Sequence, residues 1–170
     1  MVDITLLFLQ GDAAEEAGDF ALAHERFAQC AALGDEAGWT RLGYLFDVGL
    51  GVPADKSEAM RCYRMAWRKR STVAAHNIAI LYRERGNHRA MFRWFERAAL
   101  EDDGSAYFNL AKCYLKGIGV RRSLEAAQRC LVIAAGHASS YEAEREEAEE
   151  MLAELRPRLV TSSSPRSSGT

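Results

Sequence analysis

The sequence predicts an all-α protein, a right-handed α-solenoid of about four antiparallel helical hairpins that ends in a C-terminal capping helix. Three observations predict this fold class. A chain of 170 residues that is 48% hydrophobic and 27% charged can bury a core. A glycine-containing motif occurs twice, 68 residues apart, which is close to two periods of a repeat of about 34 residues. Apolar residues recur at spacings of three, four and seven, as on one face of a helix.

The repeated motif is an aromatic residue followed by x-x-Gly-x-Gly-Val. Its first copy runs from Phe46 to Val52 and its second from Tyr114 to Val120. A longer loop between two helices requires a residue with positive φ, and glycine adopts that conformation without steric cost. We therefore interpret these glycines as structural. A phosphate-binding glycine loop is the disfavoured alternative, because no Lys-Ser/Thr pair follows and no strand precedes.

Four hairpins are expected in order, at about residues 4–35, 36–71, 72–103 and 104–138. Large side chains on one helix face, with Ala or Gly at the crossing points, let paired helices approach closely. One hairpin cannot bury its apolar stripe alone, so neighbouring hairpins must stack. The residues that mark the helices are Leu7, Gly11, Ala23, Phe27 and Cys30; Trp39, Leu42, Gly43, Phe46, Ala59, Tyr63 and Ala66; Ala75, Ile78, Ala79, Tyr82, Met91, Phe95 and Ala98; and Tyr107, Leu110, Ala111, Tyr114, Ala127, Leu131 and Ala134.

The sequence from about residue 139 onward predicts a capping helix followed by a tail. Ser139 and Ser140 precede Glu142 as in a capping box, and strong helix formers follow. We expect a helix over about residues 140–156 that covers the last hairpin, with Pro157 as the helix breaker. The repeat domain then spans residues 1–158, and residues 159–170, rich in Ser, are expected to be disordered.

The glycine loops resemble the signature of Sel-one-like repeats, a tetratricopeptide-like family. Asp55, Lys56, Ala59, Tyr63 and Ala66 continue the family's pattern after the first loop. The second copy departs from it, with Ser123 in place of the usual acidic residue, and the third hairpin lacks the glycine loop. The resemblance covers about residues 6–135 and implies a curved superhelix whose concave face binds a partner.

In tetratricopeptide-like stacks the first helix of each hairpin lines the concave face, so the resemblance implies candidate partner-binding residues there. They form an apolar track with acidic charge towards the N-terminus and basic charge towards the C-terminus, as a peptide-binding groove requires. The alternative for each residue is packing against a neighbouring hairpin or the terminal helix. The candidates are Phe8, Asp12, Glu15, Thr40, Tyr44, Asp47, His76, Ile80, Arg83, Phe108, Lys112 and Lys116.

The charge and the N-terminal segment argue against several classes of partner. A formal charge of −2 gives no general attraction to nucleic acid or to anionic lipid. The apolar run from Ile4 to Leu9 is too short to span a membrane, and Asp3 replaces the positive flank of a secretory signal. We therefore expect a cytoplasmic protein with no nucleic-acid or membrane partner.

The sequence contains no recognisable catalytic or metal-binding motif. Its four cysteines form no C-x-x-C pair, its four histidines show no metal-ligand spacing, and neither H-E-x-x-H nor G-x-S-x-G occurs. We interpret the cysteines as small buried hydrophobic residues. The expectation is a protein without catalytic activity, metal or cofactor.

The leading functional hypothesis is an adaptor or scaffold that binds a partner protein or peptide in its concave groove, with no small-molecule substrate. The small stand-alone domain suggests a bacterial source. The alternative is a dedicated inhibitor, such as an immunity-type protein that neutralises one enzyme or toxin. A hydrolase of the cysteine-rich Sel-one-like type is least favoured, because those relatives resemble repeats stapled by paired cysteines, which this chain lacks.

Overall fold

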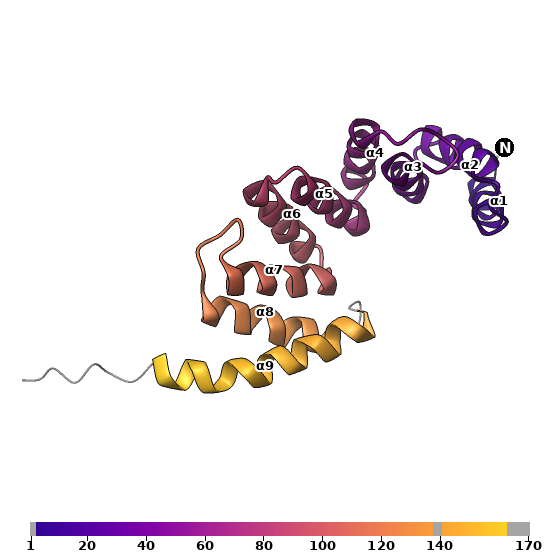
Figure 1. The fold of residues 1–170 in the computed structure, drawn as a ribbon. Coiled ribbons are helices and arrows are strands. Elements are labelled where there is room, and N and C mark those ends of the chain that lie inside the picture. The colour runs from indigo at the N-terminus through magenta and orange to yellow at the C-terminus, as the bar shows by residue number, and fades with distance from the viewer. Residues whose placement is uncertain (1–2, 138–140, 163–170) are drawn as a thin grey trace, which may run out of the picture. The chain divides into compact units, whose positions relative to one another are not determined.

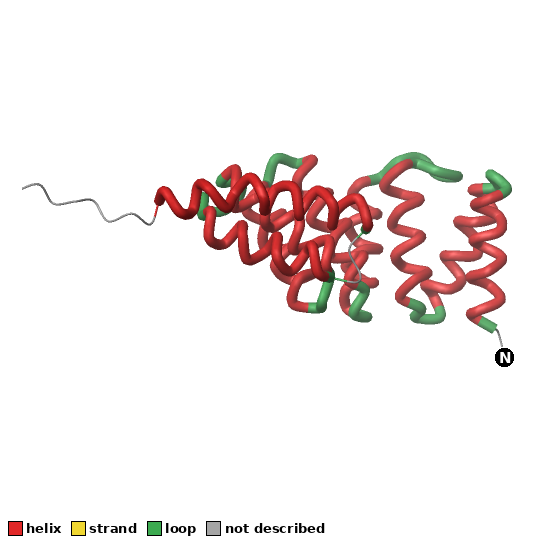
Figure 2. The backbone as a smooth tube through the Cα atoms, turned by 90° about the horizontal axis from the view of Figure 1, so that it is seen from below, coloured by secondary structure: helices red, strands yellow, loops and turns green. Residues whose placement is uncertain are grey.

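The computed structural model describes residues 3–137 and 141–162, with side chains as far as Leu155 in the last helix. Within these ranges every regular element is a helix, as Figures 1 and 2 show. The helical repeat fold predicted from the sequence is therefore confirmed. The helices are α1 (Ile4–Glu16), α2 (Phe20–Ala32), α3 (Glu36–Val48), α4 (Lys56–Arg68), α5 (Thr72–Glu84), α6 (His88–Leu100), α7 (Gly104–Lys116), α8 (Leu124–Gly136) and α9 (Glu142–Ser162).

Side-chain caps fix where the first eight helices begin. The residue before each helix carries a short oxygen-bearing side chain that accepts a hydrogen bond from a backbone amide of the first turn. The capping box expected at Ser139 and Ser140 for α9 lies outside the described residues. The eight caps are Asp3, Asp19, Asp35, Asp55, Ser71, Asn87, Asp103 and Ser123.

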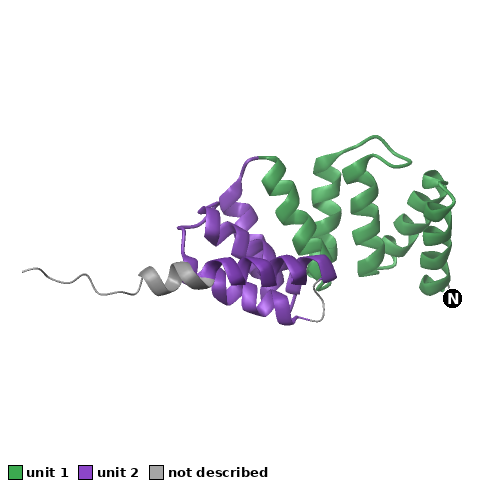
Figure 3. Ribbon diagram, turned by 60° about the horizontal axis from the view of Figure 1, so that its bottom comes forward, with its two compact units in different colours: residues 1–85 green, residues 86–170 purple. Residues whose placement is uncertain are grey.

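The chain forms two compact units, residues 1–85 and residues 86–170 (Figure 3). In the first unit each helix from α1 to α5 packs against the next. Phe27 and Leu45 are fully buried in its core, and the apolar spacing predicts this for Phe27. Gly43 lies so close to the Tyr63 ring that a β-carbon would come within 2.7 Å of it, which explains the small residue at this crossing.

The second unit is built from α6 to α9, again with each helix packed on the next. Its largest helix contact beyond the α7–α8 hairpin is between α8 and α9, which run alongside each other in Figure 1. One core cluster joins α7, α8 and α9 and contains Phe108, Ala111, Leu131, Ala134, Ala148 and Leu155. The terminal helix is thus part of the hydrophobic core of this unit.

The two glycine loops behave as the motif predicts. Gly49 and Gly117 end α3 and α7 in the left-handed conformation, with φ of 83° and 69°. Gly51 and Gly119 also have positive φ, and a β-carbon on either would collide with backbone of an earlier helix, at Phe20 and at His88 respectively. Only glycine satisfies both the dihedral angle and the close approach.

The terminal helix is longer than the sequence suggests. We expected it to end near residue 156, but α9 continues through Pro157 to Ser162. Proline removes one backbone hydrogen bond, yet its fixed φ of about −65° is a helical value, so a helix can continue past it. The expectation of a disordered tail from residue 159 is therefore wrong for residues 159–162, and residues 163–170 lie outside the described part of the chain.

Candidate functional site

The first unit contains a cavity of about 400 Å³ between α1, α3 and the start of α5. It brings together four of the residues predicted from the sequence: Phe8, Glu15, Thr40 and Tyr44. Each comes from the first helix of its hairpin, as the resemblance to tetratricopeptide-like stacks implied. The complete lining is Phe8, Glu15, Glu36, Ala37, Thr40, Arg41, Tyr44, Ser71, Val73 and Asn77.

Helical spacing explains why Thr40 and Tyr44 reach the cavity. They are four residues apart on α3 and so lie on one face, whereas their neighbours Leu42 and Gly43 are buried. Phe8 is half-buried, with its ring tilted against Phe27 at 5.4 Å between centroids, so it presents one side to the cavity. The cavity therefore rests on the aromatic core of the unit.

Apolar side chains also stand at the rim of this cavity. Tyr44 is 40% exposed, and Val73 of α5 is more than half exposed. Neither side chain is needed to complete the core clusters of the unit. Exposed aromatic and aliphatic groups beside a hollow of this size are typical of sites that receive an apolar side chain.

Acidic groups outnumber basic ones around the cavity. Arg41 forms ion pairs with Asp12, at 3.1 Å, and with Glu15, at 3.6 Å. Glu36 lines the cavity, and Glu16 lies with Asp12 and Glu15 around an adjoining hollow. One guanidinium therefore faces four carboxylates, which leaves the cavity with a local excess of negative charge.

The Thr40 hydroxyl and the Asn77 amide, two polar groups of the lining, differ in their hydrogen bonding. The Thr40 hydroxyl donates to the Glu36 carbonyl at 2.9 Å and lies 3.1 Å from the Ser71 hydroxyl. The Asn77 side-chain amide is half-buried and has no hydrogen-bond partner in the part of the chain that the structure describes. A free amide offers both donors and an acceptor, as recognition of a peptide backbone requires.

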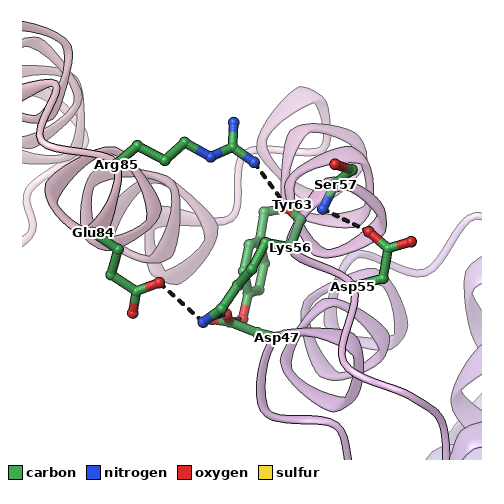
Figure 4. A network of polar contacts seen from close by, with 7 residues as sticks. All are labelled: Asp47, Asp55, Lys56, Ser57, Tyr63, Glu84 and Arg85. Atoms are coloured by element: carbon green, nitrogen blue, oxygen red, sulfur yellow. Dashed lines mark hydrogen bonds and ion pairs between the residues drawn. The ribbon is translucent and has the colours of Figure 1, made fainter.

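Asp47, another predicted site residue, is engaged within the protein instead (Figure 4). Its carboxylate is 2.6 Å from Lys56 Nζ and accepts a hydrogen bond from the Tyr63 hydroxyl at 3.3 Å. Lys56 also pairs with Glu84 at 2.9 Å, and the hydrogen bonds to Asp47 and Glu84 raise the Lys56 pKa. This network links α3, α4 and α5, so Asp47 stabilises the fold and is not a free charge for a partner.

The predicted residues on α5 miss the cavity by one position. His76 and Ile80 are half-buried and Arg83 is exposed, but none of them lines it. Val73 and Asn77 line it instead. The equivalent positions one repeat earlier are Ala37 and Arg41, which also line the cavity. Alignment of the second hairpin with the third therefore relates Val73 and Asn77 to these two positions, and this relation is the signal that sequence reasoning missed.

In the second unit the predicted groove residues are covered by α9. Phe108 is only 3% exposed and packs in one cluster with Ala148 and Leu155. Lys112 pairs with Glu147 at 3.0 Å and lies 3.9 Å from the Phe108 ring centroid. The expectation that Phe108 and Lys112 face an open groove is therefore wrong, because the terminal helix occupies their face of α7.

The contact between α7 and α9 is also polar. The Ser105 hydroxyl donates to the Glu144 carboxylate at 2.5 Å, and Ser105 is buried. Lys116, the last predicted residue, is exposed at the end of α7. The open first-helix face in the described structure thus belongs to the first unit.

The cysteines and other titratable groups bear on the chemistry available. All four cysteines are free, and burial raises the pKa of Cys62 and of Cys113 to about 11. A thiol with so high a pKa remains protonated at neutral pH and is a poor nucleophile.

Among the described residues, no group of three or more His, Cys, Asp and Glu side chains is placed to hold a metal ion. Searched over the same residues, no helix has both the length and the apolar character needed to cross a membrane.

Comparison with solved structures supports the same architecture. The chain is similar to a Sel1 repeat protein from Oxalobacter formigenes, with a TM-score of 0.75 and 24% identity over 87% of this chain and 60% of the other. It is also similar to c5321, a protective antigen present in uropathogenic Escherichia coli strains that displays an SLR fold, with a TM-score of 0.74 and 25% identity over 90% of this chain and 33% of the other.

Comparison with known sequences identifies the family. An uncharacterized protein of Neisseria meningitidis serogroup B, NMB1327, is 33% identical over 106 residues, and the match spans 62% of this chain but only 22% of that protein. The Sel1 repeat model matches residues 40–69, 73–103 and 104–137, more than half of the chain. Helices α1 and α2 precede these matches. The chain belongs to the Sel1 repeat family, as the Sel-one-like glycine loops indicate.

Proposed function

We propose that the protein is a non-catalytic interaction module whose first unit binds a segment of a partner protein in the cavity between α1, α3 and α5. The observation that carries the proposal is the cavity itself, in which Phe8, Thr40 and Tyr44 from two hairpins meet beside Val73 and Asn77. Proteins of the Sel1 repeat family typically serve as protein-interaction modules, which is consistent with this role.

The lining specifies the chemistry of the segment. Tyr44 and Val73 favour an apolar side chain that enters the cavity, since exposed aromatic residues around a hollow dominate binding energy. The excess of carboxylates around Arg41 favours a basic residue next to it. The free amide of Asn77 is placed to hold the backbone of an extended peptide. We therefore infer a segment with an apolar residue flanked by Lys or Arg.

Selection from a random peptide library tests this proposal. The wild-type chain is expected to enrich peptides that combine an apolar residue with Lys or Arg. Their affinity for the Tyr44→Ala/Val73→Ala variant should fall at least about tenfold, because both rim contacts are lost. Glu36→Arg should weaken the same peptides through charge repulsion.

The matched control is Tyr141→Ala/Val132→Ala, which makes the same two truncations at exposed positions of the second unit. It should leave the affinity unchanged. Circular dichroism and urea unfolding establish that each variant is folded. Peptides that bind both double variants equally well, or a selection that enriches no basic and apolar sequence, would contradict the proposal.

A further inference from the structure

Helix α6 of the second unit presents a stripe of arginines that ends in an exposed leucine. Arg89, Arg93, Arg97 and Leu100 are spaced by four, four and three residues and therefore lie on one helix face. All four are exposed, and Leu100 is 85% exposed. The opposite face, with Met91, Phe95 and Ala98 among its residues, is buried. We call the exposed set the α6 stripe.

The charges of this stripe are mostly unpaired. Arg89 and Arg93 make no ion pair or hydrogen bond with any other residue that the structure describes. Arg97 stands over the Trp94 ring, 4.5 Å from its centroid, an arrangement that leaves the guanidinium edge accessible. Glu96 is the carboxylate that α6 itself places beside these arginines. Within the bounds of α6, three guanidinium groups of the stripe thus accompany one carboxylate.

Two of the three acidic residues that follow α6 make contacts elsewhere. Asp102 lies 2.8 Å from the His137 ring, and Asp103 caps α7 through the Ala106 amide. They are therefore held at the start of α7 and at the end of α8. The positive charge of the stripe remains available to a partner.

A hollow lies directly beside the stripe, between α6 and α7. It has a volume of about 550 Å³ and is lined on the α6 side by Arg93, Glu96, Arg97 and Leu100 and on the α7 side by Tyr107. Apolar groups and guanidinium groups therefore occur within one site. A helix face that serves only to contact water has no need for an exposed apolar side chain such as Leu100 next to the Tyr107 ring.

We propose that the α6 stripe is a docking surface for an acidic amphipathic helix of a partner protein. Carboxylates spaced by four residues on that helix would pair with the three arginines, which form bidentate contacts with carboxylates. An apolar side chain one turn further on would cover Leu100 and enter the hollow beside Tyr107. The stripe from Arg89 to Leu100 spans about 16 Å at 1.5 Å per residue, so the partner helix needs about three turns.

This proposal is independent of the cavity in the first unit, which has the opposite charge. The composition of the stripe favours a protein ligand over nucleic acid. A phosphate backbone offers no apolar group for Leu100, and Glu96 would repel it. Nucleic acid therefore serves as a competing ligand in the experiment.

Selection from a library of 16-residue helical peptides, run on the full chain, tests the proposal. We expect enriched peptides with Asp or Glu at intervals of four residues and an apolar residue one turn beyond. Arg93→Glu/Arg97→Glu should lower their affinity at least about tenfold in fluorescence anisotropy, and the loss should shrink as salt rises from 50 to 300 mM. Leu100→Ala should lower it about threefold without any change in charge.

The matched control is Arg121→Glu/Arg122→Glu, which makes the same charge change at two exposed arginines of the same unit. This control should leave the affinity unchanged, and circular dichroism establishes that all variants are folded. An equal loss in the control, or enriched peptides without acidic residues, would overturn the proposal. A 20-nucleotide single-stranded RNA that displaces the peptides and binds more tightly would also overturn it, in favour of a nucleic-acid site.

Discussion

Helices α3 and α7 are equivalent first helices of their hairpins, one in each unit. The same face is open on α3 and covered on α7. Thr40 and Tyr44 of α3 lie 68 residues before Phe108 and Lys112 of α7, at equivalent positions. The α3 pair lines an open cavity, whereas α9 covers the α7 pair. The repeat pattern places these side chains on the same face, but the terminal helix decides whether a partner can reach them.

The largest expected difference between the units concerns stability. Phe108→Ala should lower the free energy of unfolding by about 3–5 kcal/mol, because it leaves a cavity in the core shared by α7, α8 and α9. Tyr44→Ala should cost less than about 1 kcal/mol, since the side chain is 40% exposed. Urea unfolding followed by circular dichroism measures both. Equal costs would mean that the two faces do not differ as described.

Removal of the α9 anchor should loosen the second unit alone. Leu155→Ala should cost about 2–4 kcal/mol and raise the thiol labelling rate of Cys113 at pH 8 at least about tenfold. Burial raises the Cys113 pKa to about 11, so labelling requires local opening. Peptide mapping by mass spectrometry should show no change at Cys62 of the first unit. The matched variant Leu45→Ala should reverse the pattern, and identical labelling in both variants would refute it.

A smaller effect is expected at the polar contact between α7 and α9. Ser105→Ala removes the hydrogen bond to Glu144 and leaves that carboxylate without its donor, which should cost about 1 kcal/mol. Ser57→Ala at an exposed position of the first unit is the control and should cost a few tenths of a kcal/mol or less. Thermal unfolding of both variants provides the measurement. A cost of Ser105→Ala no larger than that of Ser57→Ala would show that the bond to Glu144 contributes nothing to stability.

The smallest expected effect compares one ion pair from each unit. A double-mutant cycle on Lys112 and Glu147 should give a coupling of about 0.5 kcal/mol that falls as salt is added, because both side chains are substantially exposed. The cycle on Lys56 and Asp47 should give about 1 kcal/mol, since the Asp47 side chain is largely enclosed. The reverse order would contradict the assignment of the stronger coupling to the more enclosed pair.

The sequence was sufficient to predict the helices and the core. Phe27, Tyr63, Phe95 and Leu131 occupy the predicted apolar positions of the second helices, and all are buried. Local spacing determines which face of a helix is apolar, so this level of structure follows from periodicity. The glycine loops could be predicted in the same way, because a backbone position with positive φ favours glycine, which has no β-carbon.

The site was only partly predictable. Phe8, Thr40 and Tyr44 were expected to share a surface and do, whereas Val73 and Asn77 were missed because the register on α5 was shifted by one residue. The burial of Phe108 depends on α9, which begins more than thirty residues later. Whether a distant helix docks on a face is a matter of tertiary packing, and no local pattern around Phe108 encodes it.

The close approach at the glycine loops has a consequence for how such a chain grows by gene duplication. Gly51 fits against the backbone at Phe20, and Gly119 fits against the backbone at His88, so glycine and acceptor are both displaced by 68 residues. Copying a block of two hairpins reproduces both sides of this fit in one event. Copying a single hairpin separates the glycine from the surface that it matches. A block of two hairpins is therefore the smallest unit whose duplication preserves this fit.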